Sequence, residues 1–523
     1  MHGGHPQPVY CDLGTSKGNI DIYTDCNANS DGSIRCAPKE MRDCGDCEIE
    51  LEMEMEEGVE SRVIANEGAL LDDDGKPKRT GTAWTASAHI ITTVIGAGVL
   101  SLPWAMAQLG WIIGVFSVLV VSCVTLYTSN LLADCYRSPD PVTGKRNCTY
   151  MEAVKTNLGG KMHVVCGLVQ YVNLSGAAIG YTITTSISVV AIRKINCFHK
   201  KGIAAPCQFS NNPYTIGFGI VEIFLSQIRN FHKLSWLSIL AAAMSFGYAF
   251  IGIGLSLATI IQGKGRSTSI IGGSKEQSSV DKLWNMLVAL GNIALASSYA
   301  QIAIDIQDSL KSSPPENKVM KIANKIGIFT MTIIFLLCAC SGYASFGSDT
   351  PGSILMSSGF KEPFWLIDLA NVFIVVHLVG AYQVVTQPIF GVVEMLAGQR
   401  WSGSSFVMEE YPMSIGKMRF SFNFFRLIWR TIFVMVMTVL AMAMPFFNEM
   451  LAFLGAMGFW PLVIYFPVEM FIAKQKIRKR TIQWIGLQTL NLLFMLVSLA
   501  AACAAIHGLN RSLYKYKLFM YKE

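Results

Sequence analysis

The sequence predicts an all-α membrane protein with about eleven transmembrane helices. Three observations predict this fold class: 52% of the 523 residues are hydrophobic, only 15% are charged, and the apolar residues collect in long uninterrupted segments. A soluble domain usually carries about 25% charged residues. A chain this apolar would expose a large hydrophobic surface to water, and a lipid bilayer removes that difficulty.

The first 80 residues differ in composition from the rest of the chain. Of the 36 acidic residues, 18 precede Thr80, together with 8 of the 42 Lys and Arg residues, so this segment is acidic and the remainder is basic. The segment contains the run EIELEMEMEE and lacks the apolar content to fold alone. We predict a disordered cytosolic tail at 1–80, a transmembrane domain at 81–508 and a short extracellular tail at 509–523.

Each apolar segment has roughly the length that crosses about 30 Å of hydrocarbon. The fourth segment is short and the eighth is long, so the eighth can tilt or kink. The predicted spans are 84–107, 112–134, 162–192, 213–230, 235–261, 283–308, 325–348, 364–396, 423–445, 449–473 and 482–508.

Basic residues set the predicted orientation of these spans. Lys and Arg concentrate in the second–third, sixth–seventh and tenth–eleventh loops, most densely at 474–480. These loops are therefore placed in the cytosol with the N-terminus, and an odd number of spans places the C-terminus outside. Cys197 and Cys207 then share a loop on the oxidising side of the membrane, where they can form a disulfide.

The first span is poorly protected against breaking at its centre. Gly96, Ala97 and Gly98 are followed by Pro103, and Gly and Pro both weaken a helix. A broken helix is tolerated in hydrocarbon only where it lines a cavity. Its freed N–H groups and the positive end of a half-helix suit a carboxylate. The alternative is that these small residues only let neighbouring helices pack closely.

The sixth span contains a second interruption, in the sequence ALGNIALASSYAQIAIDIQD. Two weakened helices five spans apart are typical of a transporter built from two inverted five-helix repeats, here with one extra helix. The candidate binding residues in the two spans are Thr93, Ile95, Gly96, Ala97, Gly98, Asn292, Ala294, Ser297 and Ser298.

Ionisable side chains inside apolar spans are costly and usually functional, and three of those in this sequence are candidates for a role. They are His89, Glu222 and His377. The unperturbed pKa of His, about 6.5, suits proton exchange near neutral pH, so these residues are proton-coupling candidates. The alternative for each His is a neutral side chain that is hydrogen-bonded within the helix bundle.

The motifs of several enzyme classes are missing from the sequence. It contains no GxxxxGK[ST] nucleotide loop and no HExxH. ATP-driven transport and hydrolytic catalysis are therefore disfavoured, and we predict no enzyme activity, cofactor or metal site. The basic residues are scattered between apolar spans, which disfavours a nucleic-acid partner.

Three long stretches of the sequence are more specific. They are GTAWTASAHIITTVIGAGVLSLPWAMAQLGW, QYVNLSGAAIGYTI and FWLIDLANVFIVVHLVGAYQVVTQPIF. These stretches resemble the plant amino acid permeases of the amino acid and auxin permease family. The resemblance extends from about Gly81 to the C-terminus.

This resemblance implies proton-coupled symport of amino acids into the cell across the plasma membrane, by alternating access. It also implies the amino acid/polyamine/organocation-type transporter fold, in which 96–98 and the sixth span would hold the substrate's carboxylate and amino groups. His89 and His377 match histidines of the family. Members often read GDIAFAYSY where this chain reads GNIALASSY, so Asn292 replaces a common acid and Ser297 a common aromatic residue.

Two other functions stay open at the level of sequence. One is a non-transporting amino acid sensor that signals through the N-terminal tail to a cytosolic partner. The other is a carrier of a related carboxylate such as auxin.

Overall fold

The computed structural model describes residues 24–28, 34–38, 78–202, 205–228, 235–273, 277–355, 359–360, 362–415, 418–443 and 446–515. The chain divides into two compact units, Met1–Ala69 and Leu70–Glu523. Within the first unit, strands β1 (Thr24–Ala28) and β2 (Ile34–Pro38) pair antiparallel. The composition of residues 1–80 predicts a tail without regular structure, and this hairpin differs from that prediction. An Asp-Gly pair, typical of hairpins, separates the two strands in the sequence. The rest of the predicted tail before residue 78 lies outside the described residues.

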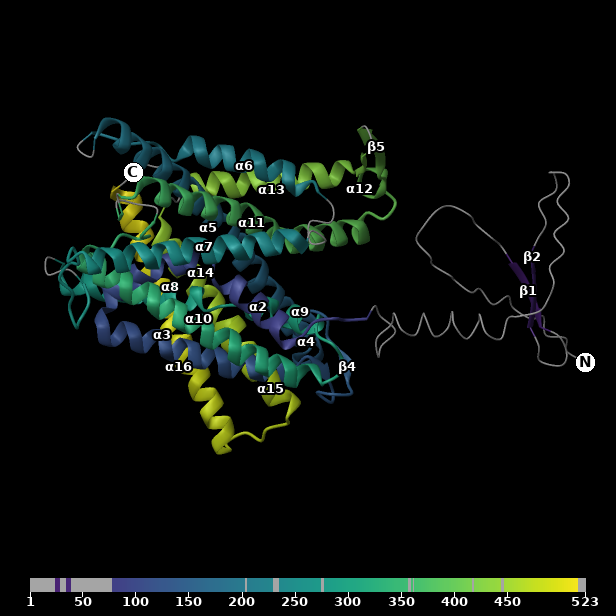
Figure 1. The fold of residues 1–523 in the computed structure, drawn as a ribbon. Coiled ribbons are helices and arrows are strands. Elements are labelled where there is room, and N and C mark those ends of the chain that lie inside the picture. The colour runs from purple at the N-terminus through teal and green to yellow at the C-terminus, as the bar shows by residue number, and fades with distance from the viewer. Residues whose placement is uncertain are drawn as a thin grey trace, which may run out of the picture. The chain divides into compact units, whose positions relative to one another are not determined.

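The second unit is built almost entirely from helices (Figure 1). Its α-helices are α2 (Ala83–Val94), α3 (Leu102–Asp134), α4 (Tyr150–Leu158), α5 (Gly160–Lys201), α6 (Asn212–Ser226), α7 (Ser235–Ile261), α8 (Ser279–Ala296), α9 (Ala300–Asp308), α10 (Glu316–Phe346), α11 (Phe364–Arg400), α12 (Ser405–Met408), α13 (Phe424–Ala443), α14 (Phe447–Gly458), α15 (Phe466–Lys474) and α16 (Ile482–Lys515). The 3₁₀ turns η1 (Ala97–Ser101) and η3 (Gly347–Asp349) and the π-helical segment η4 (Phe459–Tyr465) complete the helical part. Two small hairpins pair β3 (Arg137–Ser138) with β4 (Lys145–Arg146) and β5 (Tyr411–Ile415) with β6 (Met418–Phe422).

Among the described residues, nine helical segments are long and apolar enough to cross a membrane. Two features explain why this number is below the predicted eleven. First, the predicted spans 84–107 and 112–134 meet inside one continuous segment, which turns at Gly110 (φ 77°, ψ 178°), a conformation that glycine adopts without strain. Second, α6 has only 15 residues and is about 22 Å long, less than the hydrocarbon thickness of about 30 Å. The number eleven stays a prediction.

The helices of the second unit pack in two groups (Figure 1). In the first group, called the α3 group, α3 packs on α10 and α9, and α2 packs on α10 and α9. In the second, called the α5 group, α5 packs on α11, α6 and α13. Helix α7 contacts α10 and α11. Helix α14 contacts α5 and also α8, which packs on α3, so α7 and α14 connect the groups.

A disulfide joins Cys197, near the end of α5, to Cys207 in the segment before α6. The two cysteines are ten residues apart in sequence. The bond therefore ties the last turn of α5 to the segment that leads into α6, on the side of the membrane that the basic-residue pattern assigns to the exterior.

Candidate functional site

The first predicted span is broken between α2 and η1. Helix α2 begins at the N-cap Thr82, whose hydroxyl accepts the Thr85 N–H, and it ends where Ile95 leaves helical geometry (φ −76°, ψ 72°). Gly96 is extended (φ −113°, ψ −160°) and η1 follows. A helix break leaves carbonyls at the end of one half and N–H groups at the start of the next without helical partners.

The sixth predicted span is broken between α8 and α9. Ser297 (φ −92°, ψ 1°) ends α8, and Tyr299 (φ −138°, ψ 5°) precedes α9. Helix α8 therefore presents its carbonyl end to the break and α9 presents its N–H end. The two halves carry opposite partial charges there, each about half an elementary charge.

A cavity of about 160 Å³ lies where the two breaks meet. Thr93, Gly96 and Gly98 line it from the first break, and Ser298 and Gln301 line it from the second. Its other lining residues, many of them from α5, α11 and α14, are Val94, Asn173, Leu174, Ala177, Gly180, Tyr181, Thr184, Leu295, Ala296, Tyr299, Ile302, Val385, Leu451 and Leu454.

The lining of this cavity carries no formal charge. None of the described residues that line it is Asp, Glu, His, Lys or Arg. A charged group of a ligand would therefore be met by helix ends and by neutral polar side chains. Such a site suits a molecule that carries both charges itself, because the breaks present both N–H and carbonyl ends.

Four of the nine candidate binding residues line the cavity: Thr93, Gly96, Gly98 and Ser298. Ile95 is fully buried, and its backbone carbonyl accepts a hydrogen bond from the Tyr248 hydroxyl at 3.1 Å. The side chain of Ala97 lies outside the described residues.

The other three candidates, Asn292, Ala294 and Ser297, do not line this cavity. Asn292 is fully buried and its Nδ2 donates to Asn448 Oδ1 at 3.4 Å. Ala294 lines a separate apolar cavity against α3 and α16. Ser297 is fully buried at the end of α8. The physical reason is that α8 stays helical through Ala296, so its successive side chains point in different directions and only its last turn reaches the cavity.

The two glycines of the first break have different surroundings. A Cβ atom added at Gly98 would lie 3.2 Å from Cα and 3.3 Å from Cβ of Ala296, so Gly98 lets η1 and the end of α8 pack closely. A Cβ atom at Gly96 would have Thr93 O, at 3.9 Å, as its nearest neighbour. The alternative interpretation, that these small residues let neighbouring helices pack closely, therefore holds for Gly98. Gly96 instead has room beside it.

Two amide side chains that sequence reasoning did not select meet at the cavity. Gln301 Nε2 donates to Asn173 Oδ1 at 2.6 Å, and Asn173 Nδ2 donates to the Leu454 carbonyl at 3.1 Å. The pair links α9, α5 and α14. The available signal was an uncharged amide inside an apolar span, which is too common in membrane bundles to identify a site by itself.

His377 is buried on α11 and connects to the first break through α7. Its Nδ1 lies 3.0 Å from Ser245 Oγ and 3.2 Å from the Ala241 carbonyl. Its ring packs edge-on against Tyr248, the residue whose hydroxyl donates to the Ile95 carbonyl. A hydrogen-bonded and packed route thus connects His377 to the helix break.

The other two ionisable candidates lie elsewhere. Glu222 is fully buried on α6 and accepts a hydrogen bond from Gln383 Nε2 at 2.6 Å, and the same Nε2 donates to Ser226 Oγ at 3.1 Å. The His89 side chain is exposed, and neither residue is among the described residues that line the cavity.

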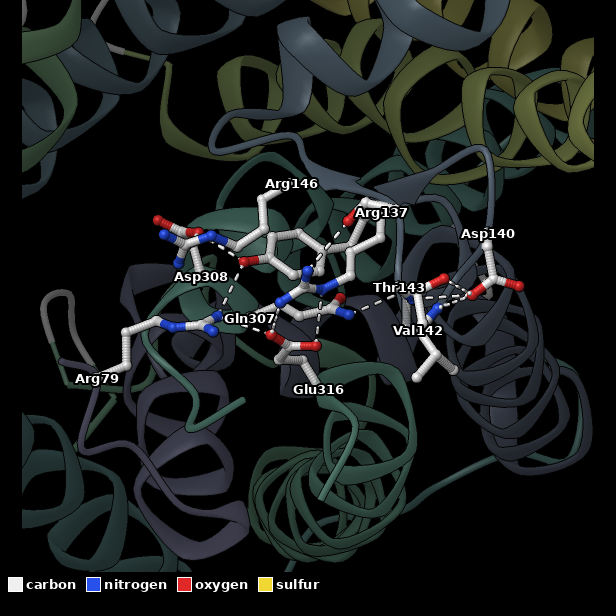
Figure 2. A network of polar contacts seen from close by, with 12 residues as sticks. Arg79, Arg137, Asp140, Val142, Thr143, Arg146, Gln307, Asp308 and Glu316 are labelled. Carbon is white, nitrogen blue, oxygen red and sulfur yellow. Dashed lines mark hydrogen bonds and ion pairs between the residues drawn. The ribbon is translucent and has the colours of Figure 1, made fainter. Parts of the chain in front are cut away.

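A buried ionic network joins the ends of several helices (Figure 2). Glu316, at the start of α10, contacts Arg79 at 2.8 Å and Arg137 at 2.6 Å, and all three side chains are at most 7% exposed. Asp308, at the end of α9, accepts the Tyr136 hydroxyl at 2.6 Å and lies 3.4 Å from Arg146. The network thereby connects the segment before α2, the β3–β4 hairpin, α9 and α10.

The surroundings of this network shift the pKa values of nearby groups. Burial and the hydrogen bond to Asp308 raise the pKa of Tyr136, so its hydroxyl stays protonated and donates. In the β3–β4 turn, the N–H groups of Thr143 and Val142 hold the pKa of Asp140 below its usual value (Figure 2). These hydrogen bonds favour the ionised form of the Asp140 carboxylate.

Comparison with known proteins identifies the family. The family model described as transmembrane amino acid transporter protein matches residues 79–510. The chain belongs to this transporter family. Two relatives of the transporter come from Arabidopsis thaliana: Amino acid permease 1 is 52% identical over 466 residues (88% of this chain, 96% of the relative), and Amino acid permease 8 is 53% identical over 454 residues (86% and 95%).

The fold of the transporter is also found among solved structures. The inward-facing conformation of Mhp1 superposes with a TM-score of 0.50 at 13% identity, covering 84% of this chain and 93% of that one. The predicted resemblance to plant amino acid permeases and the predicted all-α transporter fold are therefore confirmed. The transporter is a multi-pass membrane protein of the amino acid and auxin permease family.

Proposed function

We propose that this transporter is a proton-coupled symporter that imports amino acids across the plasma membrane by alternating access, with its N-terminus in the cytosol. The observation that carries the proposal is the cavity between the two helix breaks, which is lined by neutral residues and faced by helix ends of both signs. The relatives named as amino acid permeases support the cargo class.

An amino acid zwitterion fits the polarity of the breaks. Its carboxylate would lie at the N–H ends of η1 and α9, and its ammonium group would lie at the carbonyl ends of α2 and α8. Leu174, Leu451 and Leu454 give the cavity an apolar wall for the substrate's side chain. The loss of the family's common acid at Asn292 does not remove charge from this cavity, because Asn292 does not line it.

The coupling proton needs a site outside the cavity lining. His377 is the best placed of the three candidates, because its contacts with Ser245 and Tyr248 on α7 lead to the Ile95 carbonyl at the first break. A proton on the imidazole would change its hydrogen bonds to α7 and thereby the position of Tyr248. Glu222 and His89 stay predictions as further proton carriers.

The first test is the pH dependence of uptake. Uptake of labelled L-alanine into cells that express the transporter should increase several-fold when external pH falls from about 7.5 to about 5.5, a range that brackets the ordinary His pKa of about 6.5. A lower external pH protonates the coupling site from the outside, so uptake should increase rather than decrease as the external pH falls. Replacing sodium with choline should change nothing. Equal uptake across the pH range, or uptake that requires sodium, would contradict proton coupling.

The role of His377 has a matched control. His377→Gln keeps a hydrogen-bonding side chain that does not titrate, so the ratio of uptake at the two pH values should fall to about one. His163→Gln makes the same change at the start of α5, where the ring nitrogen lies 3.0 Å from the Met151 carbonyl, and should keep the wild-type ratio. A wild-type ratio in His377→Gln assigns the proton to another group.

A further inference from the structure

The hydrogen bond between Gln301 and Asn173 connects the two helix groups at the cavity. Gln301 is the second residue of α9, which belongs to the α3 group, and Asn173 lies on α5 in the other group. The N···O distance is 2.6 Å, and both residues line the cavity. Because α9 leads from the break to the loop assigned to the cytosol, this bond lies on the cytosolic side of the break.

The ionic network of Figure 2 has a different place in the packing. Two of its residues, Asp308 on α9 and Glu316 on α10, belong to helices of the α3 group. Their partners include Arg79, just before α2, and Arg137, just after α3, which flank two other helices of the same group. Gln307 Nε2 on α9 likewise donates to the Ala133 carbonyl on α3 at 3.0 Å. These bonds hold the α3 group together, and they need not break when that group moves relative to α5.

We propose that the Gln301–Asn173 hydrogen bond is a latch that closes the cytosolic side of the cavity, and that the substrate's carboxylate opens it by replacing Asn173 Oδ1 as the acceptor of the Gln301 amide N–H. This inference rests on the proposed function, because it requires an amino acid in the cavity. It assigns to these two residues the step that connects substrate binding to opening.

The exchange of acceptors is favourable for a chemical reason. A hydrogen bond to a carboxylate is roughly twice as strong as one between neutral groups. A carboxylate next to Gln301 also lies at the N–H end of α9, where negative charge is stabilised. Asn173 stays held in place, because its Nδ2 still donates to the Leu454 carbonyl, while its Oδ1 is released from Gln301. A ligand without a carboxylate can occupy the cavity but leaves the latch closed.

A native cysteine can report this opening. Cys166 is a fully buried free cysteine on α5, seven residues and thus about two helical turns before Asn173 on the same face. In inside-out membrane vesicles, a charged thiosulfonate reagent should label Cys166 slowly without substrate, and mass spectrometry can separate its labelling from that of other cysteines. L-Alanine should accelerate the labelling, whereas ethylamine, which lacks the carboxylate, should not.

Removing the donor should open the latch without substrate. In Gln301→Leu the basal labelling rate of Cys166 should rise about three- to tenfold, the population change expected from loss of one neutral hydrogen bond, and alanine should no longer change it. Asn173→Ala should raise the basal rate from the other side of the bond. The matched control is Gln307→Leu, which removes a glutamine bond within the α3 group and should keep both the wild-type rate and the alanine response.

Three outcomes separate the claims. A wild-type basal rate in Gln301→Leu, or an equal rise in Gln307→Leu, would contradict the latch. Acceleration by ethylamine as strong as that by alanine would contradict the carboxylate as trigger. Alanine uptake measured with the same cells tests the proposed function separately: if wild type takes up no alanine, that function fails, while the basal rates of the variants still decide whether the bond closes the cavity.

Discussion

Gly96→Leu should reduce amino acid uptake by at least about tenfold, while the amount of protein in the membrane stays normal. Gly96 lines the cavity, and a Cβ atom there would have only Thr93 O, at 3.9 Å, as its nearest neighbour. A Cβ atom therefore has room, whereas the remaining atoms of a leucine side chain would fill cavity space that the substrate needs. In enzymes, a misplacement of about 1 Å can already cost a hundredfold in rate. Labelled-alanine uptake, normalised to surface-biotinylated protein, measures the effect.

Two other glycines make this result specific. Gly217 on α6 has no neighbouring atom within 4 Å of an added Cβ, so Gly217→Leu should leave uptake and membrane amount unchanged. Gly98→Leu would press against Ala296 and should lower the amount of folded protein as well as uptake. Normal uptake in Gly96→Leu would mean that the cavity between the breaks is not the route of the substrate.

Glu316→Gln should lower the free energy of unfolding by about 3 kcal/mol, the lower end of the cost of breaking a buried ion pair. The carboxylate contacts both Arg79 and Arg137, and the three side chains are 1–7% exposed (Figure 2). The glutamine keeps the shape but removes the charge that offsets two buried guanidinium groups. Thermal unfolding of the purified protein in detergent should show an apparent melting temperature several degrees lower.

An exposed ion pair provides the control for this change. Arg266 and Asp349 pair at 2.7 Å, but their side chains are 61% and 68% exposed. Asp349→Asn should therefore change stability by less than about 1 kcal/mol, because water screens the pair. Equal melting temperatures for Glu316→Gln and wild type would show that the network does not hold the α3 group together.

The fold and the positions of the two breaks could be predicted from local sequence. Gly96 and Gly98 weaken the first span, and the small and polar residues around 291–298 weaken the sixth, so both signals lie within a few residues of the structural result. Which side chains of α8 face the cavity was not predictable. That depends on the exact residue at which the helix ends, and α8 continues to Ala296.

Long-range pairs could not be predicted from the sequence either. Asn173 and Gln301 are 128 residues apart, and Arg137 and Glu316 are 179 residues apart. Lys and Arg in the loops served as orientation signals, yet Arg137 and Arg146 are buried partners in an ionic network. The sequence alone does not distinguish a charged loop residue that faces water from one that forms a buried ion pair.

The central claim, that a proton gradient drives amino acids through the cavity between the broken helices, is tested most directly in liposomes containing the purified transporter. With an interior at about pH 7.5 and an exterior at about pH 5.5, on either side of the ordinary His pKa, labelled L-alanine should accumulate inside above its external concentration without sodium. A protonophore should abolish the accumulation, and Gly96→Leu should show none. Alanine that only equilibrates across the membrane, or that accumulates only with a sodium gradient, would contradict the account.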